Sequence, residues 1–220
     1  MTRAASHGSR AEKTRGAVLE AAEALFAERG FDATRLEDIA ERVGIRRASI
    51  VYYFKDKREL YDAVLGSVFG GLRDQVEAAL ASQAPLPERI EAAVGAWVDY
   101  VGVRPSIARI VLREAADATP ERSTALLQHT RPYAELIQRE IFERADYRET
   151  KLAPIDPVHL ASAVAGATVF FVAAMPVLVP DFEIDPLSPK RLEIHKREVL
   201  RIVRRLLGTR GPSLAGPLTR

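Results

Sequence analysis

The 220-residue chain contains no cysteine, and this absence removes several classes of protein at once. Disulfide frameworks, thiolate nucleophiles, cysteine-ligated zinc sites and iron–sulfur clusters all require that side chain. The four histidines show no zinc-ligand spacing, so His129 and His159 are expected to be hydrogen-bonded or exposed side chains rather than metal ligands. We therefore expect neither a metal nor a cofactor.

Catalytic motifs and strand signals are missing as well. The sequence has no G-x-S-x-G nucleophile elbow, no P-loop and no G-x-G-x-x-G turn. No stretch alternates apolar and polar residues long enough for a strand, and no Asn-Gly or Asp-Gly turn predicts a hairpin. These absences argue against an enzyme and against a fold that contains a sheet.

Residues 157–180 lack Asp, Glu, Lys and Arg, and such a run is long enough to suggest a membrane span. Pro157, Pro176 and Pro180, the many small residues and the lack of basic flanks argue against one. We expect instead a helix buried on two sides, against its own core and against a partner. Because the first fifteen residues are polar and basic, unlike a secretory signal, a cytoplasmic location is expected.

The charges are unevenly distributed along the chain. Residues 1–58 carry a net charge of +3, residues 59–189 a net charge of −8, and residues 190–220 a net charge of +7. A polyanionic partner would therefore contact one of the ends rather than the acidic middle.

Apolar residues recur at helical spacing throughout, which predicts an all-α fold of about nine helices. Capping boxes at Ser9–Glu12, Thr34–Glu37 and Asp56–Glu59 predict three helix starts, with Gly30 ending the first helix. The third box opens a helix that ends near Leu80. Prolines in first-turn positions predict later helices, with a kink or break at Pro132; their ranges are 87–102, 105–117, 120–147, 157–175 and 189–207.

Residues 34–58 predict a helix-turn-helix motif, because two short helices surround Gly44. Arg46 and Arg47 begin the second helix, where the helix dipole disfavours cations by roughly 0.3–1 kcal/mol each. That placement favours a site facing phosphates, since helix N-termini and guanidinium groups both bind anions. The alternative is a solvated basic helix start, with Tyr52 and Tyr53 packed inward.

Residues 15–60 resemble the DNA-binding region of the TetR family of transcriptional regulators. The matching residues are Ala21, Ala22, Leu25, Phe26, Gly30, Phe31, Thr34, Ile39, Ala40, Val43, Gly44, Ile45, Ile50, Tyr52, Tyr53, Phe54, Lys57 and Leu60. The resemblance implies that the second short helix lies in the major groove, with phosphate contacts from the Thr34 helix start and from Lys57. The chain departs from the family at Arg46, where a Ser or Thr cap is usual, and at Val51, where a phosphate-contacting Tyr is common.

Arg47, Ala48 and Val51 share one face of the second short helix. Our hypothesis is that Arg47 reads a guanine edge, while Ala48 or Val51 contacts a thymine methyl group. The residues expected to bind DNA are Thr34, Arg35, Arg46, Arg47, Ala48, Ser49, Val51, Tyr52, Tyr53 and Lys57.

The resemblance further implies a small-molecule pocket and a homodimer in the larger part of the chain. The helices near 157–175 and 189–207 are the expected dimer interface. Arg113 and Glu114 are candidates for an ion pair beside the pocket or for a solvated helix face. Side chains of this kind are more often core than pocket; the candidate lining residues are Trp97, Tyr100, Ile107, Val111, His129, Tyr133, Phe170, Phe171 and Met175.

Together these observations predict a tail over residues 1–8, a helix-turn-helix head over 9–58, an effector-binding and dimerisation domain over 59–208, and a basic tail over 209–220. The expected function is a regulator, most simply a repressor, that binds a palindromic operator and is released by a small apolar or amphipathic effector. Coupling would run along the helix near 57–80. Two alternatives stay open: a DNA-binding protein without an effector, and a helical sensor that binds a protein or membrane partner.

Overall fold

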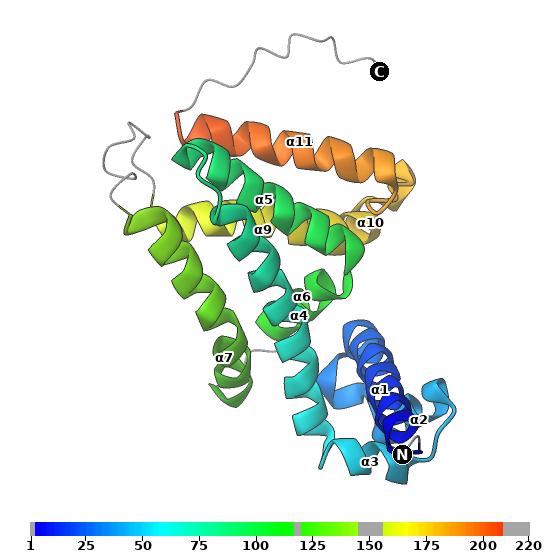
Figure 1. Ribbon diagram of the computed structural model, residues 1–220. Coiled ribbons are helices and arrows are strands. Elements are labelled where there is room, and N and C mark those ends of the chain that lie inside the picture. The colour runs from blue at the N-terminus through cyan, green and yellow to red at the C-terminus, as the bar shows by residue number, and fades with distance from the viewer. Residues whose placement is uncertain (1–2, 117–119, 145–155, 209–220) are drawn as a thin grey trace. The chain divides into compact units, whose positions relative to one another are not determined.

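A computed structural model describes residues 3–116, 120–144 and 156–208, and all regular structure within these ranges is helical (Figure 1). The all-α prediction is confirmed, and nine helices in the described ranges have seven or more residues. They are α1 (Arg3–Ala33), α2 (Leu36–Val43), α3 (Arg47–Tyr53), α4 (Lys57–Leu80), α5 (Leu86–Val103), α6 (Ser106–Ala116), α7 (Pro120–Ile137), α9 (Pro157–Ala173) and α11 (Pro189–Leu206).

Short helical turns follow two of these helices. The π-helical turn Gln138–Phe142 continues α7, while α10 (Met175–Leu178) and a 3-10 turn (Pro180–Phe182) follow α9. Of the kink or break predicted at Pro132, the break does not occur, because α7 continues past this proline. The predicted basic tail over 209–220 lies outside the described residues.

The first helix begins earlier than predicted but ends where predicted. Because α1 starts at Arg3, Ser9 and Glu12 lie inside the helix, so the predicted capping box is wrong. Gly30 has a φ of 80°, in the left-handed region that favours glycine, and it interrupts the helical backbone. The first continuous helical segment thus stops at Gly30, as predicted, and a short helical segment follows it to Ala33.

The second and third capping boxes have different outcomes. The residue before α2 is Arg35, whose backbone amide donates to the Asp38 carboxylate at 3.3 Å, so the predicted Thr34 cap is wrong. Asp56 accepts from the backbone amide of Glu59 at 2.8 Å, as the third box predicts. The Glu59 carboxylate accepts instead from the amide of Lys55, at 2.7 Å.

The chain forms two compact units, and each is described by itself. The first contains residues up to 73 together with 104–133, and the second contains residues 74–103 together with those from 134 onward. This division passes through α4 and α7, whereas the sequence predicts that the helix-turn-helix head and the larger domain meet after residue 58. As a result, α6 belongs to the same unit as the helix-turn-helix motif.

In the first unit, α1 packs against α6, α2 and α3. The apolar stripe predicted for α1, including Leu25 and Phe26, is buried. Arg113 of α6 donates to the carbonyl oxygens of Ala27 and Glu28, at 3.1 and 2.5 Å, and so supplies partners to carbonyls near the end of α1.

In the second unit, α11 packs against α5 and α9. A side chain at Gly102 would collide with Leu192, so glycine permits the close approach of α5 and α11 there. Two ion pairs join the same helices: Lys196 Nζ lies 2.6 Å from Asp99 Oδ2, and Arg204 donates to Glu91 at 2.8 and 2.5 Å. No helix in the described part of the chain is long and apolar enough to cross a membrane.

Candidate DNA-binding site

The helix α3 is anchored by two side chains and otherwise faces solvent. Ile50 and Phe54 are buried and hold α3 in the first unit. Val51 is 45% exposed and Tyr52 is 82% exposed. The predicted basic and apolar residues of this face, Arg46, Arg47 and Ala48, are exposed too. The helix therefore presents one continuous surface from its N-terminus, as binding in a DNA groove requires.

The turn between α2 and α3 is fixed by Gly44. This residue has a φ of 74°, in the left-handed region, and its amide donates to the carbonyl of Glu41 at 3.0 Å. The following amide, of Ile45, donates to the carbonyl of Ala40 at 2.9 Å. These two bonds close the end of α2 within one residue, so α3 can begin at Arg47.

Thr34 has a structural role, which corrects its assignment as a DNA contact. The residue is fully buried, and its hydroxyl lies 2.7 Å from the carbonyl oxygen of Gly30 and 3.2 Å from that of Leu25. Because its only proton is directed at these carbonyls, the side chain has neither the exposure nor the donor for a phosphate. Its position beside the helix start is what made it resemble a cap in the sequence.

Lys57 likewise binds its own chain. Its ammonium donates to the carbonyl oxygens of Phe31, Asp32 and Thr34, at 2.8, 3.3 and 3.0 Å, and lies 4.3 Å from the centre of the Phe31 ring. An ammonium has three N–H donors, and these three carbonyls use them all. The predicted phosphate contact through Lys57 is contradicted by this geometry.

The other predicted DNA contacts remain available on the surface. Arg35 and Arg46 are exposed, and Ser49 is half-buried. Tyr53 is half-buried and makes an edge-to-face contact with Tyr52 at 5.1 Å between ring centres. Tyr52 thus points outward, contrary to the alternative in which both tyrosines pack inward.

Glu37 also belongs to this surface, although the sequence did not indicate it. Its carboxylate forms an ion pair with Arg47, in which Nε and Oε1 lie 3.2 Å apart. The pair joins the first turn of α2 to the first turn of α3. A carboxylate ten residues before an arginine carries no local signal in the sequence, so only the packing of the two helices shows it.

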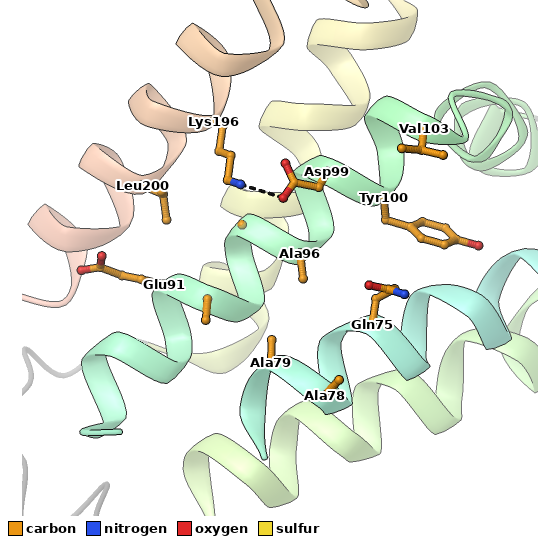
Figure 2. A pocket seen from close by; sticks show the side chains of 12 residues that line it. Gln75, Ala78, Ala79, Glu91, Ala96, Asp99, Tyr100, Val103, Lys196 and Leu200 are labelled. Atoms are coloured by element: carbon orange, nitrogen blue, oxygen red, sulfur yellow. Dashed lines mark hydrogen bonds and ion pairs between the residues drawn. The ribbon is translucent and has the colours of Figure 1, made fainter. Parts of the chain in front are cut away.

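The second unit contains a groove of about 670 Å³ on the surface of α5. Figure 2 shows Ala79 of α4 and Ala96 of α5 projecting into the space between their helices, with the ion pair of Lys196 and Asp99 on the α11 side. The lining is mostly small and apolar; its residues are Gln75, Ala78, Ala79, Glu91, Ala92, Gly95, Ala96, Asp99, Tyr100, Val103, Lys196 and Leu200.

Of the nine predicted pocket residues, Tyr100 alone lines this groove. Trp97 and Ile107 are buried, whereas Phe170 is 48% exposed. Phe171 stacks on His195, with ring centres 4.1 Å apart. Val111, His129, Tyr133 and Met175 are half-buried. The structure therefore distributes these residues among core, surface and stacking contacts.

Two of the predicted pocket residues lie one turn apart on α7, in the first unit. The Nε2 atom of His129 is buried and has no hydrogen-bond partner in the described residues. Burial lowers the pKa of His129, and the charge of Asp62 partly opposes this shift. Burial also raises the pKa of Tyr133 to about 12, so its hydroxyl stays neutral at physiological pH.

Arg113 and Glu114, the candidates for an ion pair beside the pocket, make separate contacts in the first unit. Arg113 binds the carbonyls of α1, and Glu114 accepts from the hydroxyl of Tyr61 at 2.6 Å. Their role is thus to join α6 to α1 and α4.

The helical fold and the exposed α3 define a helix-turn-helix protein, and comparison with known proteins gives its family. The sequence pattern of the tetR family of bacterial regulatory proteins matches residues 18–64. The transcriptional regulator RutR of Escherichia coli strain K12 is 31% identical over 155 residues, which cover 69% of this chain and 70% of RutR. The chain belongs to the TetR family, and it is a DNA-binding transcriptional regulator rather than an enzyme.

Solved structures share the fold at lower sequence identity. The fatty acid degradation regulator FadR of Bacillus halodurans superposes with a TM-score of 0.69 at 16% identity, covering 90% of this chain and 97% of FadR. FadR of Bacillus subtilis, in complex with stearoyl-CoA, gives a TM-score of 0.67 at 17% identity, covering 85% and 96% of the two chains.

Proposed function

We propose that the protein is a homodimeric repressor that acts in the cytoplasm, binds a palindromic DNA site through α3 and is released by a small amphipathic effector. The observation that carries this proposal is the surface of α3, which is anchored by Ile50 and Phe54 while its doubly basic N-terminus faces solvent. A two-fold dimer places two such helices in successive major grooves, about one helical turn apart.

Within this surface, Arg46 and Arg47 have different proposed roles. Arg46 contacts a phosphate, so Arg46→Ala reduces the slope of log K against log salt by about one and weakens binding to all sequences alike. Arg47 contacts a guanine, so Arg47→Ala weakens binding chiefly to sites with the correct base. The exposed Arg197 of α11 offers a control, since Arg197→Ala removes the same charge from the second unit.

Selection of bound DNA from a random pool tests the DNA-binding proposal directly. The purified full-length protein is expected to select an inverted repeat. Binding that ignores sequence at physiological salt contradicts this proposal and favours the alternative in which the basic head binds an acidic protein or membrane surface.

The dimer proposal rests on the outer face of α9. Val158 is 74% exposed and Phe170 is 48% exposed, with Ser162 and Gly166 between them at four-residue spacing. Exposed apolar residues on an uncharged helix face favour a second copy of the chain as partner. On α11, Ile202 is also an exposed apolar residue.

Sedimentation of two variants tests this interface. Phe170→Glu places a charge in the proposed interface and is expected to produce monomers at concentrations where the wild type is dimeric. Leu127→Glu, at an exposed apolar residue of α7, serves as the control and should leave the dimer intact. Equal sedimentation of Phe170→Glu and the wild type excludes this face as the interface.

For the effector, the groove on α5 is the proposed site. Its volume of about 670 Å³ lies within the range of small-molecule sites. Small apolar side chains along the groove suit an apolar chain, while Gln75 offers a polar group to the other part of an amphipathic molecule. Because the related FadR structure contains stearoyl-CoA, acyl compounds are the first to test.

A substitution that fills the groove with a large side chain tests effector binding independently of DNA binding. Ala96→Phe is expected to keep operator affinity while abolishing release by an active acyl compound. Ala81→Phe, at an exposed position outside the groove lining, should remain responsive. If no compound releases the wild type from DNA, the alternative of a regulator without an effector is favoured.

A further inference from the structure

The ion pair between Glu37 and Arg47 is too exposed to be explained by folding stability. The Arg47 side chain is 61% exposed and that of Glu37 is 57% exposed. Pairs this open to water are screened by solvent and salt and contribute little to the stability of a fold. What distinguishes this pair is its position, because it lies at the N-terminus of α3, on the surface proposed to face DNA.

The atoms of the pair show from which side the carboxylate approaches the guanidinium. The closest approach between the two side chains is from Nε of Arg47 to Oε1 of Glu37, at 3.2 Å. The two terminal amino groups of an arginine form the fork that donates to the O6 and N7 acceptors of guanine in the major groove. Because the nearest contact of the carboxylate is with Nε, it approaches the guanidinium from the side and not at the end where this fork lies.

The neighbouring charges of α2 bind elsewhere in the first unit. Asp38 pairs with Arg29 at 3.2 Å, and Arg42 pairs with Glu28 at 3.3 Å. Glu41 is exposed and makes no ion pair in the described part of the chain. Glu37 is accordingly the α2 carboxylate that contacts an α3 arginine.

We propose that Glu37 is a specificity-determining residue that positions Arg47 for a guanine contact. Through its charge, the carboxylate favours the conformation in which Nε of Arg47 faces Glu37 over conformations in which the guanidinium turns to the nearer phosphates. Glu37 itself touches no DNA in this arrangement. The inference rests on the proposed function, because it requires that α3 reads base edges.

Removing the carboxylate should change specificity and affinity in opposite directions. In Glu37→Gln, Arg47 is free to bind phosphate, and one negative charge near the DNA is lost. Discrimination at the guanine position is therefore expected to fall about tenfold, while affinity for non-specific DNA stays equal or rises. A merely structural residue would lower affinity for every DNA sequence together.

The experiment measures binding of full-length variants to three DNA duplexes: the selected site, the same site with the guanine pair replaced, and an unrelated sequence. Glu41→Gln is the matched control, since it removes the same charge one turn further along α2. We expect Glu37→Gln, but not Glu41→Gln, to lose discrimination at one position. The double variant Glu37→Gln/Arg47→Ala should discriminate no less than Arg47→Ala alone.

The outcomes separate this inference from the proposed function. If Arg47→Ala loses discrimination at one base pair and Glu37→Gln retains it, the positioning role is wrong and base reading stands. Equal behaviour of Glu37→Gln and Glu41→Gln also overturns the positioning role. If the wild type selects no site, the proposed function itself fails.

Discussion

The hydroxyl of Tyr61 on α4 donates a hydrogen bond of 2.6 Å to the carboxylate of Glu114 on α6, and both side chains are buried. The two residues are 53 positions apart in the sequence. Tyr61 also packs its ring edge-on against Phe26 of α1, with ring centres 4.8 Å apart. This one side chain therefore links three helices of the unit that contains α3.

Tyr61→Phe keeps the ring and removes the donor to a buried carboxylate. The expected loss of stability is about 1–3 kcal/mol, because a charged acceptor loses one of its hydrogen bonds away from water. Urea denaturation measures the change. Tyr52→Phe removes the same hydroxyl from an exposed ring of α3 and should leave the unfolding midpoint unchanged.

Substitution of Thr34 distinguishes its structural role from a DNA contact. Thr34→Val replaces the buried hydroxyl with a methyl group and is expected to cost roughly 1–2 kcal/mol of unfolding free energy. Thr34→Ser retains the donor to the Gly30 carbonyl and is the control for stability. Both variants, when folded, should bind the operator as tightly as the wild type; weaker operator binding by folded Thr34→Val than by Thr34→Ser would support a phosphate contact through the hydroxyl.

Lys57→Met is expected to reduce stability. It should leave the salt dependence of DNA binding unchanged, because that dependence reports the number of phosphates that the protein contacts. The three carbonyls that the ammonium binds, on Phe31, Asp32 and Thr34, lose a charged partner, at a cost of about 1–3 kcal/mol. Thermal unfolding and the salt dependence of DNA binding measure the two effects. Lys55→Met, at an exposed side chain, is the control for stability; an unaltered melting temperature in Lys57→Met contradicts the prediction.

His195 makes stability depend on pH in a defined direction. Its Nε2 lies 3.3 Å from the hydroxyl of Thr168, which itself donates to the carbonyl of Val164 at 3.2 Å. Thr168 therefore accepts from Nε2–H of His195, and in the neutral ring this corresponds to the tautomer with its proton on Nε2. Burial lowers the pKa of His195 below its ordinary value of 6.5.

Because the unfolded chain binds this proton more readily, stability is full above the unfolded pKa and declines as pH falls through about 6.5 toward the lower folded value. The lowered pKa of His129 adds to the effect. Urea unfolding at intervals between pH 7.5 and about pH 5.5 should show this decline, and His195→Gln should make it shallower. An unchanged slope in the variant would falsify the assignment.

The helical pattern was readable from the sequence because it depends on neighbours within one or two turns. Apolar spacing gave α1 its buried stripe, and the left-handed backbone needed at Gly30 and Gly44 placed two helix ends. The same local spacing placed Arg47 and Val51 on the exposed surface of α3.

The effector site was not readable in the same way. Some of the aromatic residues predicted to line a pocket lie in the core instead, as Trp97 does, because large apolar side chains contribute most to burial. The groove on α5 is lined instead by residues such as Ala79 and Ala96. Alanine in a helix carries no signal that separates a groove from an ordinary surface.

The sequence by itself determined where the helices of this protein lie and which face of α3 is polar, since backbone conformation and side-chain spacing are local properties. Only the tertiary structure determined which side chains and backbone groups form hydrogen bonds and ion pairs with one another. The carbonyls of Phe31 and Asp32, near the end of α1, accept hydrogen bonds from the ammonium of Lys57, which is 26 and 25 residues away in the sequence. The physical reason is that a donor pairs with whichever acceptor packing brings within reach, whatever their separation along the chain.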